Sequence, residues 1–324
     1  QESENDMMRN LGKKLPPALK RPLIRLYHAP SRIHARLFQA AAHGKIPCPD
    51  KLYLKWHYRV FTGRKLNLKH PVLYQEKLQW LKYYYRNPAY TQLVDKYGVR
   101  SFVKERIGEE YLVPIYGVYN SFDEIDFDQL PDQFVLKCTH DSGSVVICTD
   151  QAHFDKAAAK KKLTEALHRN QFYLSREWYY KNVTPRIICE KYLQSDSEAG
   201  FIDYKFMCFH GEVKFLYTCT NRFVQEKINE NFFDLSWKPL PFCQEGYAAD
   251  KREISPPQNF EKMKRFAALL SADIPHVRVD FFEVQGKLYF SEMTFFDSRG
   301  TTFFVPEQYN KIIGDDITLP PIYR

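Results

Sequence analysis

The sequence lacks the features that mark secreted, membrane-spanning or zinc-binding proteins. Its seven cysteines are odd in number and contain no CxxC pair, so neither a disulfide framework nor a zinc site is indicated. The ten histidines form no HExxH motif, which argues against a histidine-bound metal. No apolar run reaches the roughly 18 to 20 residues that cross a membrane, and no secretory signal opens the chain. We therefore expect a cytoplasmic protein with free thiols.

Acidic residues are missing from residues 9–49, which contain nine Lys or Arg and six Pro. The whole chain has a net charge of +8, and residues 50–324 contribute only +2 of it. Short helical pieces with Leu and Ile opposite Arg predict that residues 1–70 form a basic arm on the body. Peripheral contact of this arm with an anionic membrane surface or a polyanionic glycan stays open. No helix-turn-helix, zinc-finger or RRM signature occurs, so we expect no nucleic-acid partner.

The remaining patterns predict an α+β protein dominated by antiparallel strand pairs. With 324 residues, of which 44% are hydrophobic and 16% aromatic, the chain can form one large domain or two smaller ones. Helical spacing covers residues 71–88, 88–108, 150–170 (with Asp150 as N-cap) and 255–273. Period-two patterns predict strands within 111–119, 133–140, 142–149 and 186–193, and a hairpin over 203–220 that turns at His210 and Gly211.

A second hairpin, residues 278–300, carries an acid on each arm, Asp280 and Glu292. A two-residue turn would put them on opposite faces, whereas a three-residue loop over 285–287 pairs them and sets Phe282 opposite Phe290. The second register gains apolar cross-strand pairs of about 0.2 to 1 kcal/mol each. It also places two carboxylates side by side, which is costly unless a cation lies between them. Oxygen ligands of this kind suit Mg²⁺; the alternative is two acids that fray into solvent.

Other segments carry weaker signals for phosphate or nucleotide binding. Lys137 interrupts a strand before a small, polar loop that contains Gly143, and such a loop can turn backbone N–H groups toward a phosphate. Glu190 follows an apolar run, where a strand edge could bind a purine. Asp203 and Lys205 share one strand face. Each residue taken alone is also typical of the solvated side of a half-buried strand.

In their order along the chain, these segments resemble the ATP-grasp superfamily, and most closely its teichuronopeptide-biosynthesis (TupA-like) branch. The motifs are DKYGVR, FVLKCTHDSGS, ICEKYL, DYKF, RVDFF and FSEMTFF, together with YQEKLQWLKYYYRNP and EEYLVPIYGVY. They span residues 70–310. The resemblance implies two α+β subdomains whose antiparallel sheets clasp ATP, after a helical N-terminal region. The implied division is 1–70, 71–193 and 194–324.

The resemblance also implies which residues hold the nucleotide. The phosphates would be contacted by Lys96, Lys137 and Lys205. A small-residue loop with Ser142, Gly143 and Ser144 would close over them. Adenine would be held at the strand edge formed by Glu190, Lys191, Tyr192 and Leu193.

For the reacting groups, the resemblance implies Mg²⁺ bound by Asp280 and Glu292, and an oxyanion stabilised by Arg278. The acceptor would dock at residues 298–300, with Arg299 in a catalytic role. Thr294 stands where the family often has a metal-binding Asn. One metal ion or two is therefore open, and Asp297 is a candidate replacement ligand.

These assignments predict an ATP- and Mg²⁺-dependent carboxylate–amine ligase that works through an acyl phosphate. The branch that the chain resembles implies that the acceptor is an acidic sugar or amino acid in cell-surface or capsular polysaccharide biosynthesis. The enzyme would be cytoplasmic, and its peripheral contact with the inner face of the membrane stays open. An ATP-dependent kinase on the same scaffold is an alternative. A nucleotide-sugar glycosyltransferase is another, because Asp126-Phe127-Asp128 is a DxD sequence. A non-catalytic polyanion-binding protein is the third.

Overall fold

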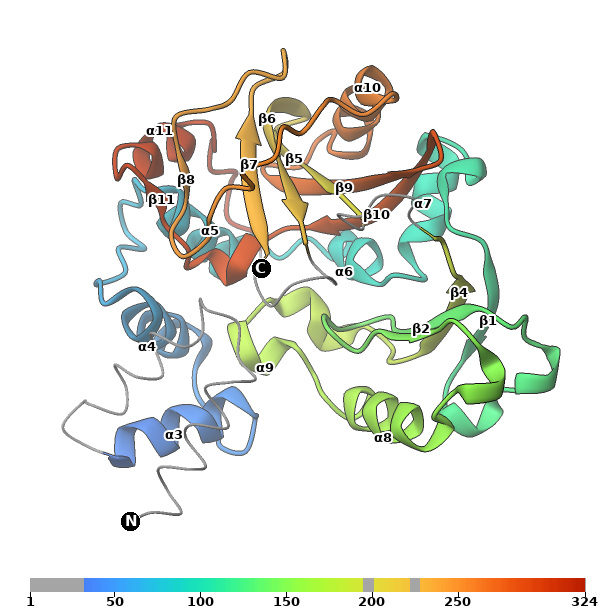
Figure 1. Cartoon of the computed structure of the whole chain (residues 1–324). Helices are drawn as coiled ribbons and strands as arrows, with labels where there is room; N and C mark the ends of the chain where they lie inside the picture. The colour runs from blue at the N-terminus through green and yellow to red at the C-terminus, as the bar shows by residue number, and fades with distance from the viewer. Residues whose placement is uncertain (1–31, 195–200, 222–227, 324) are drawn as a thin grey trace.

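The computed structural model describes residues 32–194, 201–221 and 228–323. Residues 1–31 of the basic arm therefore lie outside the described residues, including the helical piece expected near residues 19–28. Two antiparallel sheets face each other across the molecule, and helices cover their outer faces (Figure 1). Within the described chain, no helix has the length and apolar character that a membrane crossing requires. All seven cysteines are free, as predicted.

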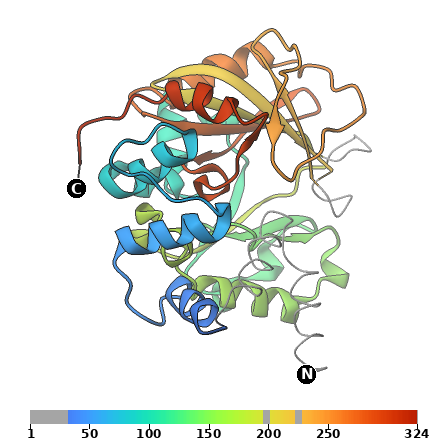
Figure 2. The same ribbon diagram turned by 90° about the vertical axis from the view of Figure 1, so that its left-hand side faces the viewer.

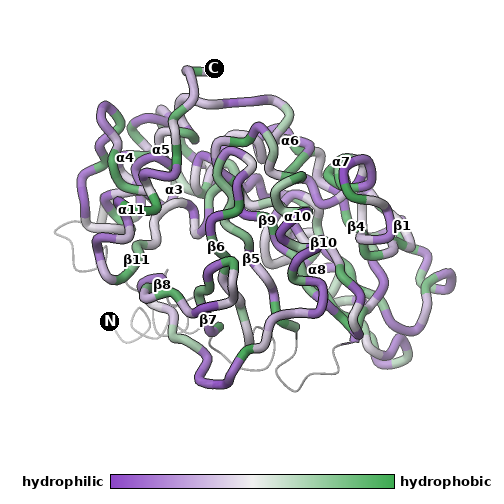
Figure 3. The backbone as a smooth tube through the Cα atoms, turned by 90° about the horizontal axis from the view of Figure 1, so that it is seen from above, coloured by the Kyte–Doolittle hydropathy of each residue, from purple (hydrophilic) through white to green (hydrophobic). Residues whose placement is uncertain are grey.

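The larger sheet has five strands in the order β10-β9-β5-β6-β7. Their bounds are β5 Asp203–Phe209, β6 Glu212–Thr220, β7 Asn229–Phe233, β9 Val277–Val284 and β10 Lys287–Thr294. His210 and Gly211 both have positive φ, 52° and 82°, which confirms the predicted tight turn between β5 and β6. Helix α10 (Phe260–Leu270) packs on this sheet, and its apolar side and the strands share one hydrophobic core. Figure 3 shows hydrophobic stretches along β5 and β6.

The smaller sheet has four strands in the order β1-β4-β2-β3. Their bounds are β1 Ile115–Tyr119, β2 Phe134–Cys138, β3 Val146–Cys148 and β4 Ile187–Lys191. Helix α8 (Lys156–Leu167) packs on it and shares a core with Phe134 and Leu136. The predicted helix start at Asp150 is wrong. Asp150 caps the 3-10 turn η4 (Gln151–His153), and Asp155 caps α8 by accepting a hydrogen bond from the Ala158 amide.

The predicted single helix over 88–108 is also wrong, because the chain breaks it into two. The Asp95 side chain accepts a hydrogen bond from the Tyr97 amide at 3.1 Å, and such a local bond competes with helix continuation. The break lies between α6 (Ala89–Val94) and α7 (Val99–Arg106). As a consequence, Lys96 leaves the helical path and enters the space between the two sheets.

Further helices lie on one side of the two sheets (Figure 2). They are α3 Arg32–Ala42, α4 Asp50–Thr62, α5 Tyr74–Tyr84, α9 Phe172–Ser175 and α11 Tyr309–Asp315. Three of them, α3, α4 and α9, share a separate small core. Short 3-10 segments are η1 Glu109–Tyr111, η2 Phe122–Glu124, η3 Phe127–Gln129, η5 Trp178–Asn182 and η6 Asp297–Gly300. A small sheet pairs β8 (Cys243–Gln244) with β11 (Phe304–Val305).

The β9–β10 hairpin combines parts of both expected registers. Its turn has two residues, Gln285 and Gly286, so the three-residue loop is wrong and Phe282 pairs with Tyr289 rather than Phe290. A β-bulge between Phe290 and Glu292 then adds one residue and shifts the register. Beyond the bulge, Glu292 pairs with Asp280. The expected side-by-side carboxylates are therefore present, and the bulge is what brings them together.

Candidate functional site

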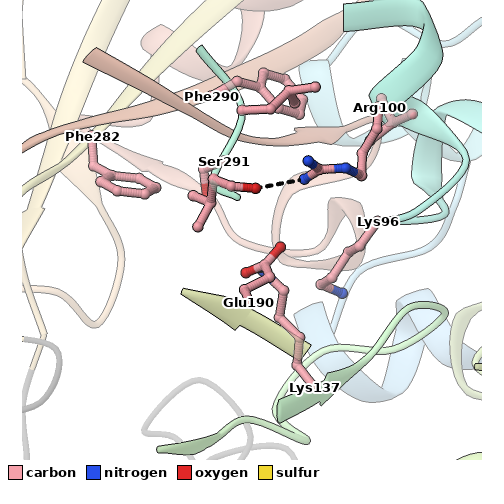
Figure 4. A pocket seen from close by; sticks show the side chains of 10 residues that line it. Lys96, Arg100, Lys137, Glu190, Phe282, Phe290 and Ser291 are labelled. Carbon is pink, nitrogen blue, oxygen red and sulfur yellow. Dashed lines mark hydrogen bonds and ion pairs between the residues drawn. The ribbon is translucent and has the colours of Figure 1, made fainter. Parts of the chain in front are cut away.

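A pocket lies where the two sheets approach each other. It is lined by Lys96, Val99, Arg100, Leu112, Val113, Lys137, Glu190, Phe282, Phe290 and Ser291. Figure 4 shows Lys137 and Glu190 reaching into it from the smaller sheet, opposite residues of β9, β10 and α7. Its volume is about 70 Å³. Small-molecule sites usually enclose at least about 300 Å³, so this conformation of the pocket is narrow.

An ion pair between Lys137 and Glu190 lies on the smaller-sheet side of the pocket. Lys137 Nζ lies 2.6 Å from Glu190 Oε2, and both side chains are mostly buried. They stand on the neighbouring strands β2 and β4, where Glu190 pairs with Val135 and Lys137 pairs with Ile188. The lysine expected to bind phosphate thus has a carboxylate as its partner in this conformation.

Lys96 joins the helical break to the loop that follows β2. Its amide donates to the Thr139 carbonyl at 3.0 Å, and its ammonium donates to the Asp141 carbonyl. Burial lowers the pKa of Lys96, while the nearby Glu292 carboxylate opposes that shift. Lys96 therefore lines the pocket and also lies near Glu292, so it brings a positive charge close to both.

The small-residue loop contains one fixed and two exposed positions. The Ser144 hydroxyl donates to Asp141 Oδ1 at 2.5 Å and accepts from the Cys138 amide at 3.0 Å. Ser142 and Gly143 are exposed. Gly143 has φ +105°, and an added Cβ would meet no atom within 4 Å. The structure thus leaves Ser142 and Gly143 at the surface and uses Ser144 to anchor the loop.

The strand edge expected to hold adenine lies beside the pocket. The Lys191 amide is already bonded to the Pro114 carbonyl at 2.9 Å, and the Lys191 side chain is exposed. Tyr192 and Leu193 are half-buried. Leu193 packs in an apolar cluster with Val113, Val284, Tyr289, Phe201 and Phe282. Two residues of this cluster, Val113 and Phe282, line the pocket. Together with Arg100, they are lining residues to which the sequence motifs assigned no role.

The expected metal ligand Asp280 is buried and held by two cations. Its Oδ2 lies 2.6 Å from Lys205 Nζ and 2.7 Å from Arg278 Nη2, and its Oδ1 accepts from Arg278 Nε at 2.7 Å. Burial and Arg278 lower the pKa of Lys205, but Asp280 and Asp203 outweigh them and raise it. The counter-charge that the paired acids require is thus provided by the protein itself.

Arg278 uses all of its donor nitrogens within the protein. Besides Asp280, it donates to the Tyr217 hydroxyl at 2.9 Å, to Thr294 Oγ1 at 3.1 Å, and to Asp297. Asp297 also accepts from Tyr217 and from Gln244 Nε2, at 3.0 and 2.7 Å. Burial favours the neutral acid, but Arg278 and Gln244 lower the pKa of Asp297 overall. Both carboxylate oxygens of Asp297 thus already accept hydrogen bonds from the protein in this conformation.

Glu292 is the more accessible of the paired acids. Its side chain is 40% exposed, and Oε1 lies 3.4 Å from Arg278 Nη2 and 3.2 Å from Thr294 Oγ1. Among the residues described, no three His, Cys, Asp or Glu side chains are grouped to hold a metal ion. Mg²⁺ usually takes only one or two protein carboxylates together with phosphates and water. The donor set therefore fits a magnesium ion that arrives with a nucleotide, and Glu292 is the acid that would hold it.

The loop expected to bind the acceptor has a left-handed backbone. Ser298, Arg299 and Gly300 have φ of 47°, 59° and 64°. Two buried side chains of α5 hold it: Gln79 Nε2 donates to the Arg299 and Gly300 carbonyls at 3.0 and 2.9 Å, and Lys82 Nζ donates to the Arg299 carbonyl at 2.7 Å. Burial lowers the pKa of Lys82 to about 8.

Glu230 is a buried acid that was not expected from the sequence. It lies on the same face of the larger sheet as Lys205 and Asp280. It lies on β7 opposite Cys219, whose Sγ is 3.9 Å from Oε1, while Oε2 has no partner among the described residues. Burial, followed by the nearby Asp297, raises the pKa of Glu230 to about 8, against Lys205. Since it alternates with Asn229 and Asn231 on an ordinary short strand, no sequence motif signalled it.

The DxD sequence lies in a surface turn beside the smaller sheet. Asp126 caps η3, and its Oδ1 accepts a hydrogen bond from the Asp128 amide at 3.1 Å. Asp126 and Asp128 are both exposed, and the intervening Phe127 is buried. The two acids are thus explained by a local turn.

Comparison with known proteins identifies the family. The sequence profile of the TupA-like ATPgrasp family matches residues 76–318, and the chain therefore belongs to that family. A search of curated proteins gave no match.

Solved structures similar to the chain include three ligases or synthetases. D-alanine–D-alanine ligase from Bacillus anthracis is 16% identical, with a TM-score of 0.36, over 63% of this chain and 57% of that one. The Helicobacter pylori enzyme of the same name is 14% identical, with a TM-score of 0.38, over 76% and 69%. D-cycloserine synthetase DcsG is 16% identical, with a TM-score of 0.36, over 64% of each chain. The chain thus spans 57% of the Bacillus anthracis ligase that it matches.

Proposed function

We propose that this protein is an ATP- and Mg²⁺-dependent carboxylate–amine ligase. In this proposal, a substrate carboxylate takes the γ-phosphoryl group of ATP, and an amine then displaces phosphate to form an amide. The observation that supports it most is the pocket between the sheets, where Lys96, Lys137 and Glu190 meet in a member of the TupA-like ATP-grasp family.

Nucleotide binding would change the contacts inside the pocket. At about 70 Å³ the pocket is too narrow for a nucleotide, so the sheets would move apart. A phosphate would take the place of the Glu190 carboxylate beside Lys137, which frees Glu190 to accept a hydrogen bond from the base. Lys96 and Lys137 would then neutralise the phosphoryl oxygens, which is the main requirement of this chemistry.

Magnesium would be held by Glu292 and, after an exchange of partners, by Asp280. A bound Mg²⁺ neutralises charge on the phosphates and orients them. For Asp280 to take part, Lys205 or Arg278 would turn from its carboxylate toward substrate oxygens. That exchange would make Lys205 a phosphate ligand and Arg278 an oxyanion ligand.

For the acceptor we propose an acidic sugar or amino acid in cell-surface polysaccharide biosynthesis. The support is membership of the TupA-like branch together with the chemistry of the loop at residues 298–300. Arg299 is half-buried there, and its guanidinium makes no hydrogen bond or ion pair with a described residue. It would bind the acceptor carboxylate. The basic segment 9–49 would keep the enzyme near an anionic precursor or membrane surface.

Product analysis tests the proposed function. The purified chain is incubated with ATP, Mg²⁺ and a panel of uronic acids, amino acids and amines, and the nucleotide and phosphate products are quantified. A ligase releases ADP and phosphate only when carboxylate and amine are both present. ADP without free phosphate would instead identify a kinase, and UDP released from a UDP-sugar would identify a glycosyltransferase. Either outcome contradicts the ligase.

A further inference from the structure

Arg100 is a charged residue of the pocket for which neither the motifs nor the resemblance assigned a role. It lies in the first turn of α7, just after the break that carries Lys96 into the same space. Its side chain lines the pocket together with Lys96, Lys137 and Glu190. Figure 4 shows the guanidinium directed from α7 into the pocket, above Lys96 and Glu190.

One hydrogen bond fixes the Arg100 guanidinium and leaves most of its donors open. Arg100 Nη1 donates to the Val113 carbonyl at 2.9 Å. A guanidinium has five N–H donors in a planar fork, and within the described chain this is its single hydrogen bond. It forms no ion pair there either. The bond to Val113 therefore orients the fork without satisfying it.

The charges around Arg100 are unbalanced. Burial lowers the pKa of the Arg100 guanidinium, and the largest opposing effect comes from Glu190. Glu190 is the single carboxylate among the lining residues, and it already lies 2.6 Å from Lys137. Three cations and one acid thus line the pocket, while Glu292 lies near Lys96 and Glu109 near Arg100 outside the lining. Partly buried charge of this kind is stabilised by an anion, and a polyphosphate carries the negative charge that the lining itself lacks.

The lining also separates into two parts. Val113, Phe282 and Phe290 supply apolar surface suited to a flat base, whereas Lys96, Arg100 and Lys137 supply cations. A guanidinium fork matches two phosphate oxygens in a way that a lysine ammonium does not.

We infer that Arg100 is a further nucleotide-binding residue, which contacts the phosphate oxygens together with Lys96 and Lys137. This inference rests on the proposed function, because it requires a nucleotide in this pocket. Its rival is a purely structural Arg100 that fastens α7 to residue 113.

Calorimetric titration separates the two. ADP and adenosine are each titrated into the parent chain, Arg100→Ala and Arg100→Gln; the Gln variant keeps an amide donor for Val113 but lacks charge. Arg106→Ala is the matched control, because Arg106 is exposed on the same helix. Melting temperatures without ligand report on folding.

We expect both Arg100 variants to weaken ADP binding about tenfold or more, since a charged hydrogen bond contributes about 1.5 to 3 kcal/mol. Adenosine binding should change less than about twofold, and Arg106→Ala should bind ADP like the parent. The inference is overturned if either folded Arg100 variant binds ADP like the parent, or if ADP and adenosine weaken equally. If the parent binds neither ligand, both this inference and the proposed function fail. If the parent binds ADP and the variants do too, this inference alone fails.

Discussion

Arg278 shows at the scale of single residues how two neighbouring acids are tolerated. The guanidinium lies 2.7 Å from Asp280 and 3.4 Å from Glu292, so it provides the cation that the sequence required between them. From the sequence, Mg²⁺ was expected at that position, because period-two alternation cannot show that Arg278 of β9 reaches both Asp280 on its own strand and Glu292 on β10. Arg278 can neutralise the two acids in the free protein, and Mg²⁺ can do so when a nucleotide binds, if Arg278 then exchanges partners.

Replacing Arg278 tests this electrostatic role. Arg278→Met leaves Asp280 and Asp297 buried with fewer donors, and removal of one partner from such a network costs about 3 to 5 kcal/mol of unfolding free energy. Urea denaturation measures the loss. Arg265→Met, an exposed position on α10, should change stability by less than about 0.5 kcal/mol. Equal losses in the two variants would show that Arg278 is not the stabilising counter-ion.

Glu230 gives a pH-dependent prediction. Its pKa in the folded chain is raised from 4.5 to about 8, so the folded chain keeps a proton that the unfolded chain releases between these values. The unfolding free energy of the parent should therefore fall as pH rises from about 5 to 8, by up to about 1.4 kcal/mol per unit from this group. Glu230→Gln should lack that component, so its stability relative to the parent should increase with pH.

Denaturation of both chains at pH 5, 6, 7 and 8 measures the difference. Glu307→Gln, an exposed position, controls for general effects of removing a carboxylate. A difference between Glu230→Gln and the parent that stays constant across this range would contradict the raised pKa.

The elements illustrate which parts of the fold the sequence could predict. The β5–β6 hairpin was predictable because alternation and the His210-Gly211 turn agree. The β9–β10 hairpin was predictable only in part. Its bulge puts Phe290 on the side of Phe281 and Glu292 on the side of Asp280, although residues two apart in a regular strand share a face. No local pattern announces that extra residue.

Helix α5 and the acceptor loop form a second pair of elements that the sequence could not connect. Gln79 and Lys82 bind the carbonyls of residues 299 and 300, more than two hundred residues further along the chain. Contacts of this kind depend on the complete fold. The break at Asp95 was in principle predictable, since Asp and Gly in one short segment are typical of turns.

Gly300→Ala tests how closely α5 and this loop approach each other. Gly300 has φ +64°, and an added Cβ would lie 2.7 Å from Gln79 Nε2 and 3.0 Å from Leu78 Cβ. We expect a loss of about 2 to 4 kcal/mol from left-handed strain and overpacking together. Gly246→Ala is the matched control, because Gly246 also has positive φ, +97°, but its Cβ would meet nothing within 4 Å.

Thermal and urea denaturation of both variants provide the comparison. Gly246→Ala should lose about 1 to 2 kcal/mol, from backbone strain alone. If Gly300→Ala lost no more than Gly246→Ala, the α5 contact would not constrain the acceptor loop.

At the scale of the whole molecule, the resemblance predicted the family and the two facing sheets, because both depend on the order of many segments. The pocket between the sheets was less predictable. It joins residues from four separate parts of the chain, and side chains such as Arg100 and Phe282 enter it only because of the way the sheets face each other. The positions of Lys137 and Glu190 were expected, but their ion pair was not, since it forms between neighbouring strands.

The proposed function requires a nucleotide to bind between the two sheets, and a melting experiment with ATP and Mg²⁺ tests that requirement. A ligand at one hundred times its dissociation constant stabilises the folded state by about 2.7 kcal/mol, so the melting temperature of the parent should rise by several degrees. Lys137→Ala should abolish the rise, and Lys160→Ala, which changes an exposed lysine of α8, should preserve it. An unchanged melting temperature of the parent, or an equal rise in Lys137→Ala, would contradict the account.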